Sequence, residues 1–236
     1  MTFVRVERRF QGPERSGNGG YVAGLVGTAL AAELGTETVP KVTLRMPPPL
    51  EKDLELKPGL LTDGDAVVAE AVQVDSDFLA DATIDPVLPD EAREAEASYR
   101  GLQNHPFPSC FVCGPSNPQG LQLKPGPIGD GRTACTWKPA AELGTGGLID
   151  ELFLWAALDC PGGWTIDLEG RPSVLGQLTA SIDARPRVGE ECVALGRYLG
   201  EDGRKTFTAS TLYDADGRVL ARAKHTWITV DPAAFN

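Results

Sequence analysis

Apolar and charged residues alternate at the start of the chain and then give way to a long apolar run. Residues 2–9 alternate in a way that predicts a strand with one face exposed to solvent. A glycine-rich break at residues 17–20 follows. Residues 21–34 carry Ala, Leu, Val and Gly at most positions and no charge before Glu33, so we expect a helix buried nearly all round.

Further strands are expected after this helix. Residues 38–46 and 53–57 have strand-like patterns and are joined through three consecutive prolines. The sequence Asp-Gly-Asp at residues 63–65 is a hairpin turn that precedes a strand at residues 66–75.

The second half of the chain follows the same plan. A strand is predicted at residues 132–138 and a helix at residues 149–158. Asp-Gly turns then separate a run of strands, which we expect at residues 175–184, 190–199, 205–213 and 219–230.

The two halves also match each other in three blocks, in the same order. The run GNGGYVAGLVGTALAAELG aligns with GTGGLIDELFLWAALDCPG at an offset of 127. The blocks that begin at Val42 and Gly64 align with those that begin at Ala180 and Gly203, at offsets of 138 and 139. Such a match predicts one structural unit written twice. One helix and several strands per copy give an α+β unit, with a helix laid across an antiparallel sheet.

The boundaries of the two units follow from this repeat. We expect a first unit at residues 1–88, a linker at 89–108 and a second unit at 109–236. Residues 90–103 are polar, acidic and rich in alanine, which favours a solvated helix crossing between the halves; a flexible linker is the alternative.

Composition excludes several classes of protein. The net charge is −11 without a basic cluster, which argues against nucleic-acid binding. No apolar run reaches the roughly 18 residues of a membrane span. The charged N-terminus argues against a signal peptide, so a cytoplasmic location is expected. The odd number of cysteines, five, indicates free thiols there.

Two further motifs point to a family. Cys110-Phe111-Val112-Cys113-Gly114 is followed by Asn117-Pro118-Gln119-Gly120-Leu121, and the chain ends with YDADGRVLARAKHTW at residues 213–227. Together with the repeat, these motifs resemble the hotdog-fold thioesterase superfamily, and in particular the double-hotdog thioesterases. The resemblance implies a tandem hotdog, in which each unit is an antiparallel sheet wrapped on one central helix.

The resemblance also implies where chemistry takes place. The ligand would lie in the interface between the two units, with amide N–H groups at the start of a central helix facing the thioester carbonyl. Gly146 and Gly147 stand there in the second copy, and Gly19 and Gly20 in the first. Glycine at these positions lets the carbonyl approach the backbone.

The chain departs from the family at two positions. Many single-hotdog thioesterases have His-Gly-Gly at this turn and an Asp or Glu nine residues after the His. With the copies aligned at offset 127, Thr145 stands at the His position and Leu154 at the acid position of the second copy. In the first copy these positions hold Asn18 and Gly27. Asp150 lies one helical turn before Leu154 on the same face, so we predict Asp150 as general base or nucleophile.

Other candidates have simpler alternatives. Glu151 is a second candidate acid, although acids in a first helical turn also stabilise the helix dipole. Asn18 and Thr145 are good N-cap residues, with substrate contact possible alongside. Gln177 either orients water beside the interface or faces solvent. For Asp159, at the end of the predicted helix, a structural contact is favoured over catalysis.

The histidines and several cysteines are candidate metal ligands. His105, Cys110 and Cys113 offer three ligands, whereas a structural zinc site takes four. Cys160 and the remaining cysteines show no matching spacing, so packing is favoured and no metal site is predicted. His225 is expected to be exposed in the last strand.

The sequence therefore predicts an acyl-CoA thioesterase-like hydrolase that cleaves a thioester between two hotdog units. The alternative is a non-catalytic protein that binds acyl-CoA or a lipid-like ligand. Coenzyme A thioester is expected as substrate, with no cofactor, no nucleic-acid or membrane partner, and a homo-oligomer of the double unit as a further option.

Overall fold

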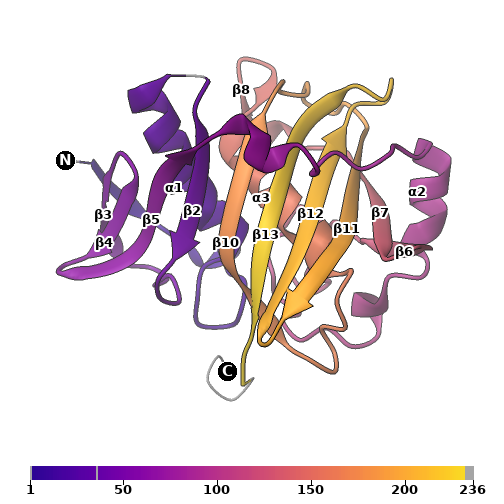
Figure 1. The fold of residues 1–236 in the computed structure, drawn as a ribbon, viewed down its shortest axis with the longest axis horizontal. Coiled ribbons are helices and arrows are strands. Elements are labelled where there is room, and N and C mark those ends of the chain that lie inside the picture. Colours follow the sequence, from indigo (N-terminus) through magenta and orange to yellow (C-terminus); the bar gives the residue numbers. More distant parts are fainter. Residues whose placement is uncertain (1, 36, 232–236) are drawn as a thin grey trace.

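The computed structural model describes residues 2–35 and 37–231, in which eleven strands form one antiparallel sheet (Figure 1). The strand order is β1-β3-β4-β5-β2-β10-β13-β12-β11-β7-β6, and β8 and β9 form a separate hairpin. The strands of the first half are β1 (Thr2–Arg5), β2 (Val39–Leu44), β3 (Asp53–Lys57), β4 (Leu60–Asp63) and β5 (Ala66–Val74). Those of the second half are β6 (Gly126–Gly129), β7 (Arg132–Trp137), β8 (Gly144–Thr145), β9 (Leu148–Ile149), β10 (Ser173–Ile182), β11 (Cys192–Asp202), β12 (Lys205–Tyr213) and β13 (Val219–Thr229).

The strand order contains the same arrangement twice. With β6 and the β8–β9 hairpin set aside, the strands of both halves have the order first, third, fourth, fifth, second: β1-β3-β4-β5-β2 and β7-β11-β12-β13-β10. The second strands of the two units, β2 and β10, pair with each other and make the sheet continuous. The prediction of an α+β fold built from a repeated unit is confirmed, since each unit has one central helix and its own part of the antiparallel sheet.

The junction between the units has approximate twofold symmetry. Lys41 is the Cα partner of Thr179, and these two residues are related by the offset of 138 seen in the sequence. Val42 pairs with Leu178 and Thr43 with Gln177, so the strands run antiparallel away from this central pair. The repeat in the sequence is therefore a repeat in the sheet.

The central helices α1 (Gly19–Leu34) and α3 (Glu151–Gly163) lie side by side behind the sheet in the view of Figure 1. A Cβ added at Gly20 would lie 2.6 Å from Cβ of Asp159, and one at Gly24 would lie 2.9 Å from Cβ of Trp155. The start of α1 thus meets the end of α3, and the helices are antiparallel. Glycines on α1 let the two backbones approach closely.

The helix α1 is less buried than predicted, and α3 is longer than predicted. α1 is buried up to Leu30, but its last turn is exposed. α3 begins two residues later than predicted and continues five residues further, through Pro161. Its carbonyls find partners outside the helix, since Thr133 Oγ1 donates to Pro161 O at 2.7 Å. None of the described helices is long and apolar enough to cross a membrane.

His225 was expected to be exposed, and this prediction is wrong. His225 belongs to β13, and its side chain is 3% exposed and packs against α3. Nε2 donates to Leu158 O at 3.0 Å, and Nδ1 lies 3.1 Å from Thr208 Oγ1. Burial lowers the pKa of His225 to about 4, so the ring is neutral near pH 7.

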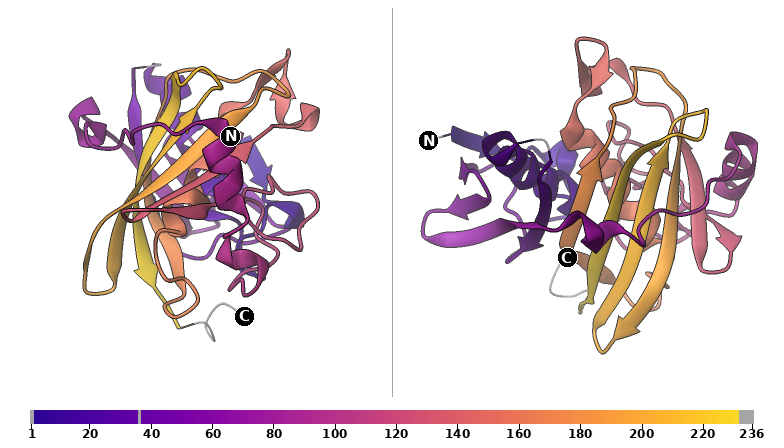
Figure 2. Two further views of the ribbon diagram at one scale, coloured as in Figure 1. Left: turned by 90° about the vertical axis from the view of Figure 1, so that its right-hand side faces the viewer. Right: turned by 45° about the horizontal axis from the view of Figure 1, so that its top comes forward.

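The connection between the units crosses the face of the sheet opposite the helices (Figures 1 and 2). It contains a 3-10 turn, η2 (Ser76–Leu79), and leads to α2 (Pro89–Glu96) at the far edge. Leu79, Ala82 and Ile84 are buried there and form a second apolar core with side chains of β11 and β12. The connection therefore packs on the second unit.

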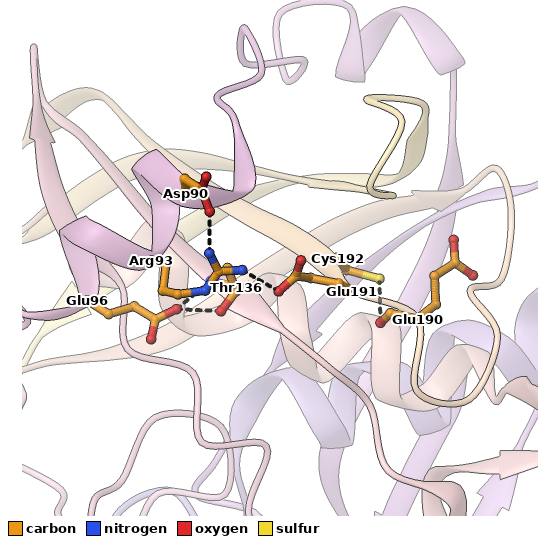
Figure 3. Close-up of polar contacts among 7 residues, drawn as sticks. All are labelled: Asp90, Arg93, Glu96, Thr136, Glu190, Glu191 and Cys192. Carbon is orange, nitrogen blue, oxygen red and sulfur yellow. Dashed lines mark hydrogen bonds and ion pairs between the residues drawn. The ribbon is translucent and has the colours of Figure 1, made fainter.

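The helix α2 is anchored by polar side chains (Figure 3). Arg93 pairs with Glu191 at 2.6 Å, and Glu96 accepts hydrogen bonds from the backbone and hydroxyl of Thr136 at 2.8 and 2.6 Å. The helix ends at Glu96 rather than continuing to residue 103, and a short 3-10 turn, η3 (Arg100–Leu102), follows.

Candidate functional site

A cavity of about 270 Å³ lies where the start of α1 meets the end of α3. Asn18 and Gly19 line it from α1, and Asp159 and Cys160 line it from α3. Its walls are otherwise mostly apolar and come from both units and from the segment between them, including Leu44, Met46, Phe107, Trp164, Leu175 and Trp227. A largely apolar cavity with a few converging polar groups is typical of a small-molecule site.

Asp159 is the carboxyl group of this cavity. It is 2% exposed, and its Oδ2 accepts hydrogen bonds from Asn18 Nδ2 at 2.9 Å and from the Gly20 amide at 3.0 Å. Its Oδ1 is buried and has no hydrogen-bond partner among the described residues. Burial raises the pKa of Asp159 to about 7, and the nearby Cys110 sulfur contributes in the same direction. The site therefore contains a fixed carboxyl group with one unused oxygen.

Asn18 holds this carboxyl group in place. As predicted, it caps α1: Oδ1 accepts a hydrogen bond from the Tyr21 amide at 2.8 Å. The cap turns Nδ2 towards Asp159 Oδ2. The Asn18 side chain thus both caps the N-terminus of α1 and orients the carboxyl group of Asp159.

Gly19 and Gly20 begin α1 as predicted. A Cβ at Gly19 would lie 2.8 Å from Cβ of Leu175, so only glycine fits between the helix and β10 without a shift. The first amides of a helix have no acceptor within the helix and lie at the positive end of its dipole. The Gly20 amide donates to Asp159 and the Tyr21 amide to Asn18, so among the described residues the Gly19 amide is the first-turn donor that remains without an acceptor, and Gly19 lines the cavity.

Three cysteine sulfurs gather at the same cavity. Cys110, Cys113 and Cys160 have Sγ atoms within 4.8 Å of one another, and all three residues line the cavity as free thiols. Hydrogen bonds from the other two thiols lower the pKa of Cys110. Asn18 Nδ2 lies 3.7 Å from Cys110 Sγ and thus links the cluster to Asp159.

Gly146 and Gly147 do not stand where the sequence predicted. They form the turn of the hairpin between β8 and β9, before α3 begins at Glu151. Their φ angles are 64° and 84°, in the left-handed region that glycine adopts without strain. They serve a turn, and their amides are not the first amides of the central helix.

Asp150 also differs from its predicted place. It is the N-cap position of α3 rather than a residue inside the helix, and its side chain is 42% exposed. Arg185 pairs with Oδ1 at 2.8 Å, and Thr145 Oγ1 donates to Oδ2 at 3.1 Å. Thr145 lies in β8 and is not an N-cap. Glu151 is exposed, and none of these side chains lines the cavity.

The helix starts correct the alignment of the repeats. The two N-cap positions are Asn18 and Asp150, an offset of 132 rather than 127. Nine residues after them come Gly27 and Asp159. Asp159 therefore occupies the position at which the family resemblance expects an acid. The similar glycine pairs concealed this, because the β8–β9 hairpin shifts the second pair by five residues.

Gln177 lies at the junction between the units. Its side chain is half-buried, and Nε2 donates to Thr43 Oγ1 at 3.0 Å across β10 and β2. Gln177 does not line the cavity, although its neighbours Leu175 and Gly176 do. Its predicted role in orienting water stays a prediction.

Comparison with known proteins finds similar structures, all at low sequence identity. No family model matches the chain, and no curated protein matches its sequence. Among solved structures, a thioesterase superfamily protein is similar with 20% identity, a TM-score of 0.48, and coverage of 65% of this chain and 72% of that one. The PaaI protein of E. coli, from the phenylacetic acid degradation operon, is similar with 12% identity, a TM-score of 0.46, and coverage of 61% and 97%. The smu.793 protein of Streptococcus mutans UA159, bound to acetyl CoA, has 15% identity, a TM-score of 0.42, and coverage of 46% and 88%.

Proposed function

We propose that this protein hydrolyses an acyl-CoA thioester in the cavity between its two units, with Asp159 as general base. The observation that carries the proposal is the Asp159 carboxyl group. Asn18 and Gly20 hold it through one oxygen, and the other oxygen has no hydrogen-bond partner in the described part of the chain. An oriented carboxylate of this kind needs only a water molecule to act.

The proposed reaction uses groups on both units. Asp159 Oδ1 accepts a proton from water while the water oxygen forms a bond to the thioester carbonyl carbon. Because the Gly20 and Tyr21 amides already donate to Asp159 and Asn18, the Gly19 amide at the start of α1 stabilises the negative charge that develops on the carbonyl oxygen. The C–S bond then breaks, and the proton held by Asp159 passes to the leaving thiolate.

The cavity favours a small apolar acyl group. Its volume of about 270 Å³ is too small for a whole acyl-CoA, and its walls include Phe107, Trp164 and Trp227. We infer that the acyl group and thioester enter the cavity while the nucleotide stays outside.

A specific observation favours a second candidate, a protein that binds acyl-CoA without cleaving it. The Gly20 amide already donates to Asp159, so this donor is engaged before any substrate arrives. If substrate does not displace that bond, the cavity binds the acyl group and the thioester stays intact.

Release of free thiol from acetyl-, hexanoyl- and benzoyl-CoA tests the proposal. Asp159→Asn keeps the size of the side chain and removes the base, so we expect kcat to fall by about 100-fold. Asp150→Asn is the comparison, because it changes an acid at the other end of the same helix, and we expect its activity to stay within about twofold of wild type.

Other outcomes separate the alternatives. Equal losses in both variants would show a general effect of charge and would contradict a special role for Asp159. A loss of thiol release in Asp150→Asn alone would support Asp150, the residue predicted from the sequence, as the catalytic acid. Saturable binding of acyl-CoA by the wild type without thiol release would establish the binding protein.

A further inference from the structure

We propose that Cys110, Cys113 and Cys160 bind one Zn²⁺ ion through three thiolates, with the fourth ligand supplied from the cavity. This inference is independent of the proposed hydrolysis, since it rests on the arrangement of the sulfurs and of the groups around them.

The distances between the sulfurs suit a zinc ion. A Zn–S bond of about 2.3 Å in a tetrahedral site places two sulfurs roughly 3.7 Å apart. Cys110 Sγ and Cys160 Sγ are 3.8 Å apart, and Cys113 Sγ and Cys160 Sγ are 3.1 Å apart. The first of these pairs has the required separation and the second needs to open by roughly 0.6 Å. The third pair, Cys110 Sγ and Cys113 Sγ, lies within 4.8 Å.

The backbone brings the first two thiols together. Cys110 and Cys113 have the C-x-x-C spacing common in zinc sites, and the Gly114 amide donates to Cys110 O at 2.9 Å, which closes the turn. A Cβ at Gly114 would lie 2.3 Å from the Cys110 nitrogen, so this turn requires glycine. Cys160, in the last turns of α3, completes the cluster from the other side.

N–H groups around the cluster point at sulfur atoms. Trp164 Nε1 donates to Cys113 Sγ at 3.4 Å, and Asn18 Nδ2 donates to Cys110 Sγ at 3.7 Å. His105 Nε2 lies 3.3 Å from Cys113 Sγ, while its Nδ1 accepts a hydrogen bond from the Phe107 amide at 2.9 Å. A neutral His105 therefore carries its proton on Nε2 and donates it to the sulfur.

These three donors indicate a site built for thiolates rather than thiols. Sulfur accepts hydrogen bonds strongly only when it carries charge, and N–H donors to metal-bound sulfur are the expected second layer of a thiolate centre. Three thiolates and Zn²⁺ leave one net negative charge, which the donors offset. On binding, the three thiols release their protons to solvent.

His105 is assigned as a donor and not as the fourth ligand. If Nε2 bound the metal, Nδ1 would carry the proton and could not accept from the Phe107 amide. Cys110, Cys113 and Cys160 all line the cavity, so the remaining position of the tetrahedron is open to water or to a small ligand there.

Elemental analysis tests the proposal directly. The full chain, purified under reducing conditions without chelator from zinc-supplemented cells, is expected to contain about one zinc per chain. Cys110→Ser, Cys113→Ser and Cys160→Ser should each retain less than about a tenth of it. Cys135→Ser and Cys192→Ser are matched controls, because both residues are free, fully buried cysteines outside the cluster, and should keep the metal.

A second measurement applies even if the cluster variants fail to fold. Co²⁺ added to the reduced, metal-free wild type should give the intense visible absorption of a tetrahedral site and a thiolate-to-cobalt charge-transfer band. Ethanethiol should shift that spectrum by occupying the open position. His105→Ala should keep the metal stoichiometry.

Several results would overturn the proposal. The first is a wild-type protein that contains no zinc and gives no cobalt spectrum. The second is retention of zinc by the cluster variants. The third is copper in place of zinc, or an intact mass that shows a Cys113–Cys160 disulfide in the reduced preparation. A cobalt spectrum that ethanethiol leaves unchanged would contradict the open position, and loss of zinc in His105→Ala would make His105 a ligand.

Discussion

The helix pair has two ends that occupy equivalent places in the repeat but are built differently. At one end the start of α1 faces Asp159, which is buried beside the cavity. At the other end Asp150 is the N-cap of α3, and its side chain is half-exposed and paired with Arg185. The position equivalent to Asp159 is Gly27 in α1, and a Cβ there would lie 2.6 Å from the ring of Trp155.

The difference shows how a duplicated unit can keep its fold and specialise one site. Both ends keep the antiparallel helices and the joined sheet, because these bury the core. Trp155 fills the space at one end, whereas the other end keeps a polar pair, Asn18 and Asp159, beside the three sulfurs. Burial of a carboxyl group costs free energy unless something compensates, which favours a functional reason for Asp159.

The largest expected effect compares the two helices in the core. Leu154 of α3 is 0% exposed, so Leu154→Ala should leave a cavity and lower the free energy of unfolding by about 2–5 kcal/mol. Leu25 of α1 is only partly buried, and Leu25→Ala should cost about 1 kcal/mol. Urea denaturation of both variants measures the difference. Equal losses would contradict the unequal burial of the helices.

His225 should make the packing of α3 sensitive to acid. Its pKa is about 4 in the folded protein against 6.5 for an ordinary histidine, so the unfolded chain binds the extra proton first as pH falls. The contribution is complete above pH 6.5 and should be lost between pH 6.5 and 4, by about 3 kcal/mol in total.

The comparison for this prediction is His225→Gln, which keeps a donor for Leu158 O and does not titrate. The free energy of unfolding of wild type, relative to this variant, should fall as pH is lowered from 7 to 4. Parallel pH profiles would show that His225 is not buried in its neutral form.

The two glycine pairs should respond differently to alanine. In Gly20→Ala the new Cβ would press on Asp159, which should cost about 1–3 kcal/mol and, by displacing the carboxyl group, about 100-fold in thiol release. Gly147→Ala meets only open space at a left-handed φ, so it should cost about 1–2 kcal/mol and leave activity intact. Thermal unfolding and thiol release are measured on both. Matching activity losses would place Gly147 in the site after all.

The smallest effect is expected at the exposed end of α3. The ion pair of Asp150 and Arg185 is partly solvated, with side chains 42% and 32% exposed, so Arg185→Ala should cost no more than about 1 kcal/mol. Its effect should shrink in high salt. A loss of several kcal/mol in urea denaturation would mean that this end carries a larger structural role than its exposure suggests.

Local signals in the sequence predicted much of the fold correctly. The Asp-Gly turns located β12 and β13 to within a residue, because a hairpin turn has strict backbone requirements. β4 was missed, since it has only four residues. The Asn18 cap of α1 is confirmed for the same reason, as a cap is decided by its immediate neighbours, although the helix begins at Gly19 and not at residue 21.

The site was harder to predict, since its parts are distant in the chain. Cys160 lies 47 residues after Cys113 and showed no spacing that would link them. Asp159 was expected at the end of the helix with a structural contact, yet α3 continues to Gly163. The β8–β9 hairpin then made the wrong glycine pair look equivalent to Gly19 and Gly20.

The sequence by itself determined the repeated α+β unit, the two central helices and the cap that begins α1. These features depend on periodicity, turns and caps, which act over a few residues. Only the tertiary structure decided which acid lies in the cavity and which cysteines meet. The antiparallel crossing of α1 and α3 brings Asn18 to Asp159 across 141 residues, and no local pattern encodes how two distant helices approach each other.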